Sequence, residues 1–142
     1  MGRILVVDDS AGLRALYRAE FEAEGHDVLV CGNFEEAASI ARVSEPDVIV
    51  ADIMPAQDSR PLADLLRNNN GRRAIFLVIN TDYDSAGLHP LAQWAQAVLL
   101  KSPDLGPLKG KVRRLLARGW FGSRLGPAAS CRPPRAEEDE RP

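Results

Sequence analysis

Two hydrophobic periods alternate along the first 118 residues of the chain. Short runs of β-branched and other apolar residues predict five strands, at Ile4–Val7, Val28–Val30, Val48–Val50, Ile75–Ile79 and Val98–Leu100. The stretches between them carry apolar residues three and four positions apart, which is the spacing of one helix face. We therefore expect five helices, whose apolar faces include Leu13, Phe34, Leu62, Leu88 and Leu105. Asn33, with Glu36 three residues later, predicts the N-cap of the second helix.

Strands that alternate with helices favour βαβ units and a parallel sheet covered by helices on both faces. The predicted strands are apolar almost throughout, as expected for strands buried on both faces. Because crossover connections are right-handed, few topologies remain. The sequence predicts an α/β fold with a doubly wound five-stranded parallel sheet in the flavodoxin-like order 2-1-3-4-5, and with five helices.

The composition changes near Gly119. Residues 119–142 contain four prolines and three glycines and end in the acidic run Glu137–Glu140. Such a segment buries too little apolar surface to offset the entropy lost on ordering. We therefore predict one domain over residues 1–118 and a disordered tail over 119–142.

The overall charge and composition exclude several classes of protein. Eighteen basic and twenty acidic residues give a net charge of −2, without the basic excess of a protein that binds nucleic acid through its phosphates. No apolar run approaches the roughly 20 residues of a membrane span. Cys31 and Cys131 are too far apart in sequence for a ligand cluster and fit a reducing compartment, although a single bridge stays open. We expect a soluble cytoplasmic protein that does not bind DNA directly.

Polar residues that could bind a ligand or take part in a reaction follow four of the predicted strands. Ligands of open α/β sheets bind beyond the carboxyl ends of the strands, near the point where the strand order reverses. The residues that the sequence places at this edge are Asp8, Asp9, Asp52, Thr81 and Lys101. Three neighbouring carboxylates repel one another, and Mg²⁺ suits them because it binds few carboxylates and keeps positions for water and phosphate oxygens. A carboxylate beside such a metal and a lysine can attack a phosphoryl group and form an acyl phosphate.

Each of these residues also has a purely structural interpretation. Asp8 or Asp9 could cap the following helix, and Asp52 could be a turn residue before Pro55. Lys101 could be a solvated loop residue. Taken singly, these interpretations are favoured, whereas the joint occurrence of all five residues at successive strand ends favours a functional site.

Two segments resemble a known family. Ile4–Ser10 resembles the opening of two-component response regulator receiver domains, and Pro46–Pro55 resembles the segment around their phosphorylated aspartate. Thr81 and Lys101 have the spacings that the family uses for its switch hydroxyl and its lysine. The resemblance covers about residues 3 to 118.

The resemblance implies that Asp52 accepts a phosphoryl group from a sensor histidine kinase or a histidine phosphotransfer protein. It also implies that Asp9, with Asp8 partly through water, binds Mg²⁺ together with Asp52 and the backbone carbonyl of Met54. Thr81 and Lys101 would contact the phosphate. By resemblance to the family, the face of helix 4, strand 5 and helix 5 would bind a downstream protein. The 24 residues after the domain are too few for an output domain, so we expect signalling by protein contact.

Several positions depart from the family pattern. Asp82 stands where a small residue usually follows the switch hydroxyl, and Val98 stands where an aromatic residue often precedes the lysine. Ser59 replaces the usual glycine, and Ser102 separates the lysine from the proline. These changes bear on switching more than on phosphorylation, so Asp82 and Val98 are candidate modulators.

Two other functions remain open at this point. A pseudo-receiver would bind its partner whether or not Asp52 is phosphorylated. A small metal-dependent phosphohydrolase would use Asp52 as nucleophile, but it would need a general acid two residues later, where this chain has Met54. We therefore expect self-phosphorylation in a stand-alone receiver rather than turnover of an external substrate.

Overall fold

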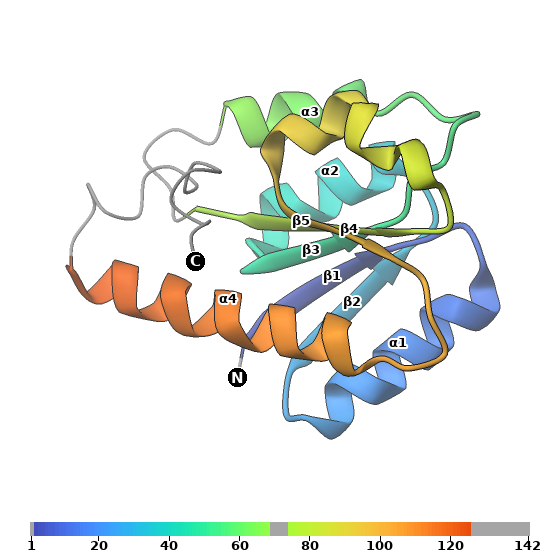
Figure 1. Cartoon of the computed structure of the whole chain (residues 1–142). Coiled ribbons are helices and arrows are strands. Elements are labelled where there is room, and N and C mark those ends of the chain that lie inside the picture. Colours follow the sequence, from blue (N-terminus) through green and yellow to red (C-terminus); the bar gives the residue numbers. More distant parts are fainter. Residues whose placement is uncertain (1, 69–73, 126–142) are drawn as a thin grey trace.

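The computed structural model describes residues 2–68 and 74–125, in which β-strands and helices alternate (Figure 1). The strands are β1 Arg3–Val7, β2 Asp27–Cys31, β3 Val48–Ala51, β4 Phe76–Thr81 and β5 Ala95–Leu100. The α-helices are α1 Ala11–Ala23, α2 Phe34–Ser44, α3 Arg60–Arg67 and α4 Gly106–Leu125. Two 3-10 helices, η1 Asp84–Leu88 and η2 Pro90–Trp94, connect β4 to β5. The predicted α/β class is therefore confirmed.

All strand pairs are parallel, and the order is β2-β1-β3-β4-β5, as predicted. The three central strands are in register at Val6, Val50 and Val78. The strand order reverses between β1 and β3, which places the ends of these two strands side by side. Any ligand site of this sheet is therefore expected at the carboxyl ends of β1, β3 and β4.

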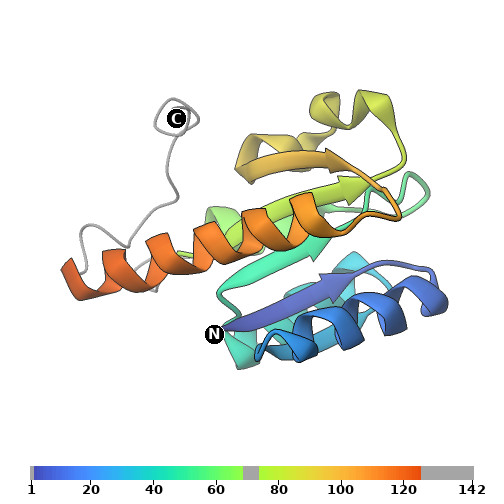
Figure 2. The ribbon, with the colours of Figure 1, turned by 60° about the horizontal axis from the view of Figure 1, so that its bottom comes forward.

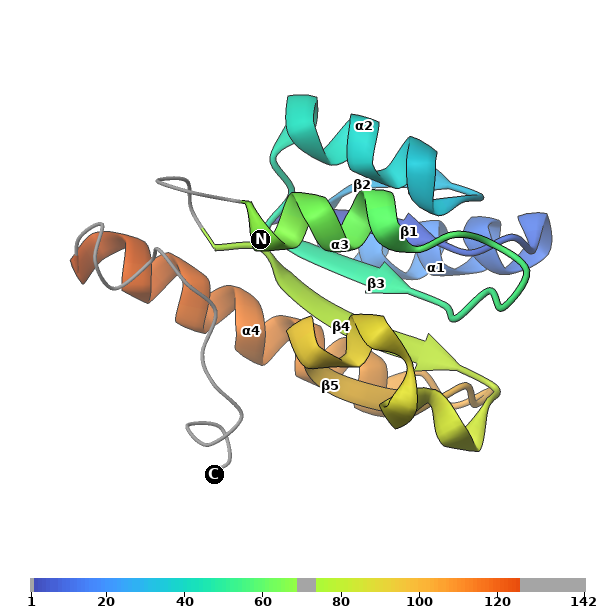
Figure 3. The ribbon, with the colours of Figure 1, turned by 90° about the horizontal axis from the view of Figure 1, so that it is seen from above.

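Helices cover both faces of the sheet, so each strand contributes alternate residues to two apolar layers. Helices α1 and α4 lie on one face (Figure 2), and α2 and α3 lie on the other (Figure 3). The layer beneath α1 and α4 contains Val6, Val50 and Val78. The layer beneath α2 and α3 contains their strand neighbours Val7, Ala51 and Ile79.

The N-terminal ends of α1 and α2 are capped by side chains. The Ser10 hydroxyl accepts from the Leu13 amide at 3.2 Å, so Ser10, rather than either neighbouring aspartate, caps α1. The Asn33 side chain accepts from the Glu36 amide at 2.7 Å, which confirms the predicted cap of α2. Neither Asp8 nor Asp9 is therefore needed as a helix cap.

The prediction of a fifth helix, between β4 and β5, is wrong. Within the described residues there are four α-helices, and the apolar positions at Leu88 and Leu91 belong instead to η1 and η2. Pro90 disfavours helical backbone at the residue before it, and His89 is extended, with ψ of 145°. The helical pattern is thus interrupted at this dipeptide, and β5 begins at Ala95, earlier than the predicted Val98.

The C-terminal helix crosses the predicted domain boundary. Helix α4 continues to Leu125, whereas the predicted domain ends at residue 118. The rest of the predicted tail, 126–142, lies outside the described residues. No helix in the described part of the chain is both long enough and apolar enough to cross a membrane.

Candidate functional site

Three polar residues occupy the same level on three adjacent strands. Asp8, Asp52 and Asn80 each follow, by two positions, one member of the aligned row Val6, Val50 and Val78. The pairing continues to this level, because the Asp8 amide donates to Cys31 O and the Asp52 amide donates to Val7 O. Adjacent strands are about 4.8 Å apart, so register alone brings these side chains together.

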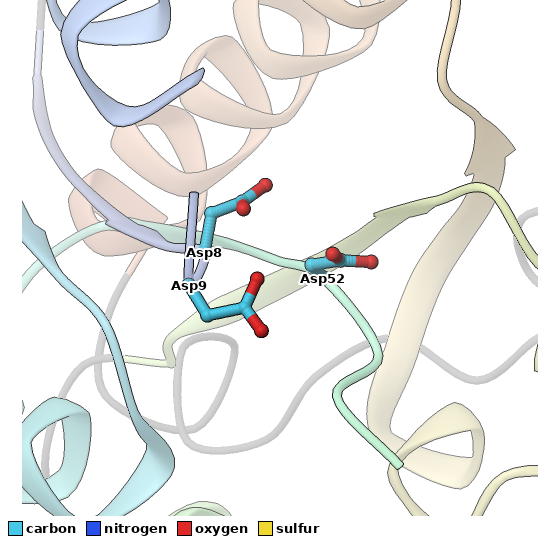
Figure 4. Close-up of side chains that lie close together, drawn as sticks. All are labelled: Asp8, Asp9 and Asp52. Carbon is cyan, nitrogen blue, oxygen red and sulfur yellow. The ribbon is translucent and has the colours of Figure 1, made fainter. Parts of the chain in front are cut away.

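The predicted acidic cluster is present at the ends of β1 and β3 (Figure 4). Asp8, Asp9 and Asp52 each offer one carboxylate oxygen, and these oxygens lie within 4.8 Å of one another. Asp8 and Asp52 are buried, whereas Asp9 is exposed. Asp8 Oδ1 accepts from the Ser10 amide at 2.9 Å. The Oδ1 atom of Asp52 is buried and has no hydrogen-bond partner among the described residues.

Lys101 bridges the two buried carboxylates. Its Nζ atom lies 2.9 Å from Asp8 Oδ2 and 3.0 Å from Asp52 Oδ2, and its side chain is 11% exposed. Burial alone would lower the pKa of Lys101, but the hydrogen bonds to both carboxylates and their negative charges raise it above its ordinary value. The ammonium group is therefore charged and partly compensates the acidic cluster.

Thr81 ends β4 and is fully buried. Its hydroxyl accepts a long hydrogen bond of 3.4 Å from the Tyr83 amide, and its backbone oxygen accepts from the Lys101 amide at 2.8 Å. The structure thus joins the two strand ends that carry Thr81 and Lys101. Asp82, the next residue, is exposed, so its charge is turned toward solvent.

Met54 lies in a turn that a glutamine fastens. The Met54 backbone oxygen accepts from the Gln57 amide at 2.9 Å, and the Met54 side chain is buried. The Gln57 side chain accepts from the Phe34 amide and donates to Gly32 O, both at 3.2 Å. Sequence reasoning missed Gln57, because no local pattern indicates contacts to residues more than 20 positions earlier.

Two further polar residues near the site were not predicted to be part of it. Asn80 directly precedes Thr81 on β4, and Tyr17 is a buried residue of α1. The Asn80 amide nitrogen donates to the Tyr17 hydroxyl at 3.1 Å. Burial raises the pKa of Tyr17; its hydrogen bond with Asn80 and the charge of Lys101 oppose that rise. The register at Val78 is the signal that could have located Asn80.

Val98 is 42% exposed on β5, which is the edge strand of the sheet. It is not part of the acidic cluster. Leu100 on the same strand is 58% exposed, and Leu88 in η1 is 87% exposed. The candidate modulators Asp82 and Val98 therefore both lie on the surface.

The side chains at this edge fit a small divalent cation. Mg²⁺ prefers oxygen ligands, and the three carboxylates supply them within a distance that one ion can span. Among the described residues, the Oδ1 atom of Asp52 has no hydrogen-bond donor, and a bound cation can satisfy this acceptor. The arrangement of carboxylates, an ammonium group and a buried hydroxyl suits recognition of a phosphoryl group.

Comparison with known proteins extends the picture, although no protein-family model matches the chain. The DNA-binding response regulator MtrA of Mycobacterium tuberculosis is 33% identical over 117 residues, which are 82% of this chain and 51% of MtrA. The chain thus spans about half the length of the curated relatives of this kind. Protein PilH of Pseudomonas aeruginosa is 32% identical over 120 residues, which cover 82% of this chain and 99% of PilH.

Solved structures agree with the sequence relatives. The response regulator TrrA from Thermotoga maritima, in complex with Mg²⁺ and BeF, has 27% identity and a TM-score of 0.71, with 81% of this chain and 99% of that chain covered. A second TrrA structure, in complex with the histidine kinase ThkA, has 28% identity, a TM-score of 0.68 and coverage of 82% and 99%. From the relatives, the strand order and the acidic edge, we conclude that this chain belongs to the family of response regulator receiver domains.

Proposed function

We propose that the chain is a phosphorylatable switch in which Asp52 accepts a phosphoryl group from a phosphohistidine. The observation that carries this proposal is the environment of Asp52. One of its oxygens is held by Lys101 at 3.0 Å, the other has no partner among the described residues, and two further carboxylates adjoin it. A buried carboxylate in this setting is both positioned and available to react.

In the proposed reaction, a carboxylate oxygen of Asp52 attacks phosphorus, the O–P bond forms, and the bond from phosphorus to the histidine nitrogen breaks. Asp8, Asp9, Asp52 and the Met54 carbonyl would hold Mg²⁺, which supplies positive charge for the phosphoryl oxygens. Lys101 would move part of its interaction from the carboxylates to the phosphoryl group. The Thr81 hydroxyl would turn from the Tyr83 amide to donate to a phosphoryl oxygen.

The phosphoryl donor that we propose is a sensor histidine kinase or a histidine phosphotransfer protein. The structure of TrrA with the kinase ThkA supports a kinase of this class. We propose cytoplasmic signalling by contact with a downstream protein rather than by direct DNA binding. The proposed contact face includes η1, η2 and β5, where Leu88, Val98 and Leu100 are exposed.

Phosphorylation by a small donor tests the proposal directly. The full chain is incubated with acetyl phosphate and Mg²⁺, and intact mass is followed with time. We expect a gain of one phosphoryl group in the wild type, none in Asp52→Asn, and none when EDTA replaces Mg²⁺. Equal modification of Asp52→Asn, or none in the wild type, would contradict the proposal. Partner binding that is indifferent to Asp52→Asn would instead favour a pseudo-receiver.

A further inference from the structure

A buried hydrogen bond crosses the apolar layer beneath α1. Tyr17 and Asn80 are 3% and 4% exposed, and 63 positions separate them in the sequence. Tyr17 belongs to the apolar cluster that also contains Val50, Val78 and Phe21. A polar pair in such a layer costs desolvation and must be matched well to be neutral for stability. A buried polar pair that carries this cost is a candidate for a role beyond packing.

Asn80 stands at the level of the reacting carboxylates. It is the third member of the row that begins with Asp8 and Asp52 on the adjacent strands. Its side chain therefore lies on the same face of the sheet as theirs, beside the strand that carries Asp52. The Asn80 amide nitrogen donates to Tyr17 on α1, so an effect of Asn80 on the site would pass through the backbone of β4.

The contacts around the pair form a closed loop of interactions. Asn80 precedes Thr81, whose backbone oxygen accepts from the Lys101 amide. The Lys101 ammonium group reaches Asp8, whose Oδ1 atom accepts from the amide of Ser10, the N-cap of α1. Tyr17 on α1 then returns the connection to Asn80. Thr81 and Lys101 are the residues proposed to contact phosphate. Each is thus connected to the carboxylates in both directions around this loop.

We propose that Tyr17 and Asn80 are a positioning pair for phosphoryl transfer to Asp52. Their hydrogen bond fastens the end of β4 to α1 and so holds Thr81 and Lys101 at the correct place beside the carboxylates. The inference rests on the proposed phosphorylation of Asp52. A pair with a merely structural role would lower the free energy of unfolding when broken but would leave the rate of phosphorylation unchanged.

The expected effect is on rate and not on the metal. Small misplacements of groups that contact the reacting atoms slow catalysis strongly. We expect Tyr17→Phe, which removes only the hydroxyl, to slow phosphorylation by about five- to tenfold, the loss expected from one hydrogen bond. The affinity for Mg²⁺ should stay unchanged, because Asp8, Asp9 and Asp52 are all retained.

The test compares four variants of the full chain with the wild type. Tyr17→Phe, Asn80→Leu and the double variant are incubated with acetyl phosphate and Mg²⁺, and intact mass gives the rate. Phe21→Leu is the matched control, because Phe21 is 1% exposed in the same cluster, one turn further along α1, and carries no polar atom. Calorimetric titration gives the Mg²⁺ affinity, and urea unfolding monitored by circular dichroism gives the stability.

The proposal predicts three results together. Both single variants are phosphorylated more slowly, the double variant is no slower than the slower single variant, and Phe21→Leu loses stability without losing rate. A wild-type rate in Tyr17→Phe and Asn80→Leu, or equal slowing in Phe21→Leu at equal loss of stability, would overturn the pair's role alone. Absence of any modification in the wild type would overturn the proposed function, and this inference with it.

Discussion

The Nζ atom of Lys101 lies 3.0 Å from Asp52 Oδ2, although 49 residues separate the two in the sequence. The same ammonium group contacts Asp8, so one cation serves two buried carboxylates. The site is therefore held together by internal charge neutralisation. Mg²⁺ would enter an arrangement that already contains a cation competing for the same carboxylates.

Removal of this cation should destabilise the metal-free chain. In Lys101→Met the carboxylates of Asp8 and Asp52 remain buried without their counter-charge, so we expect the free energy of unfolding to fall by roughly 3 kcal/mol at neutral pH. Mg²⁺ should restore much of this loss, since it binds only the folded site. Urea unfolding with and without Mg²⁺ measures both effects.

The matched control for this prediction is Lys109→Met. Lys109 pairs with Glu20 across α1 and α4, but its side chain is 24% exposed. We expect a much smaller loss there than in Lys101→Met, with no response to Mg²⁺, because ion pairs near the surface contribute little. Equal losses in the two variants would contradict the view that the Lys101 bridge is special.

Neutralising Asp9 should lower the affinity for Mg²⁺ without lowering the stability of the metal-free chain. Asp9 contributes an oxygen to the acidic cluster but is exposed. We expect Asp9→Asn to weaken Mg²⁺ binding by at least about 10- to 100-fold, because losing even an outer-shell partner of a metal ligand costs that much. The stability of the metal-free chain should stay the same or rise slightly, because repulsion with Asp8 and Asp52 decreases.

Calorimetric titration of Mg²⁺ measures this change in affinity. Asp64→Asn is the control, since Asp64 is exposed and pairs with Arg67 in α3. Wild-type Mg²⁺ affinity in Asp9→Asn would contradict the assignment of Asp9 to the metal site.

The two side-chain hydrogen bonds of Gln57, to the Phe34 amide and the Gly32 carbonyl, should contribute measurably to stability; we call them the Gln57 clamp. Gln57→Ala leaves the Phe34 amide and the Gly32 carbonyl without their side-chain partner, so we expect a loss of about 1–2 kcal/mol in urea unfolding. Gln93→Ala is the control, because Gln93 also donates to a backbone oxygen, that of Pro90, but is exposed. A loss in Gln57→Ala as small as that in Gln93→Ala would show that the clamp contributes nothing.

Stability should fall in mild acid because of a partly buried histidine. The His26 side chain is 6% exposed and its Nδ1 atom accepts from the Gly2 amide at 3.2 Å. Burial, followed by the nearby N-terminal charge, lowers the pKa of His26 below its usual value. The unfolded chain therefore takes up the proton first as the pH falls below about 6.5, so the free energy of unfolding falls with it.

The variant His26→Asn keeps an acceptor for the Gly2 amide but cannot be protonated. We expect its stability to depend less on pH between 7 and 5 than that of the wild type, a window chosen around the usual histidine value of about 6.5. Burial also lowers the pKa of His89, so His89→Asn shows how much of the acid sensitivity belongs to that second histidine. An unchanged pH dependence in His26→Asn would contradict the prediction.

Much of the fold follows from local pattern. The five strands, their order and the Asn33 cap are predictable because buried parallel strands and capped helices leave clear signals. The apolar spacing before β5 predicts one helix, whereas Pro90 prevents a continuous helix there and two 3-10 helices form instead. Periodicity records which residues are buried, and it does not distinguish one helix from two short turns.

The site was predictable to the extent that strand ends converge. The three aspartates and Lys101 are found together because topology alone brings the carboxyl ends of β1, β3, β4 and β5 to one edge. The Tyr17–Asn80 bond and the Gln57 clamp were not predictable, because each depends on side-chain direction across many residues of sequence. Only the structure gives the register of the strands and the directions of the side chains, and these show that such core or loop residues lie beside the site.

The interruption at His89–Pro90 has a consequence for motion. Two short 3-10 helices with i to i+3 hydrogen bonds resist opening less than one continuous α-helix of the same length. Amide hydrogens between β4 and β5 should accordingly exchange with solvent faster than those of α1 or α2. We therefore expect the backbone between β4 and β5 to adjust to a change at Thr81 more readily than the backbone of α1 or α2.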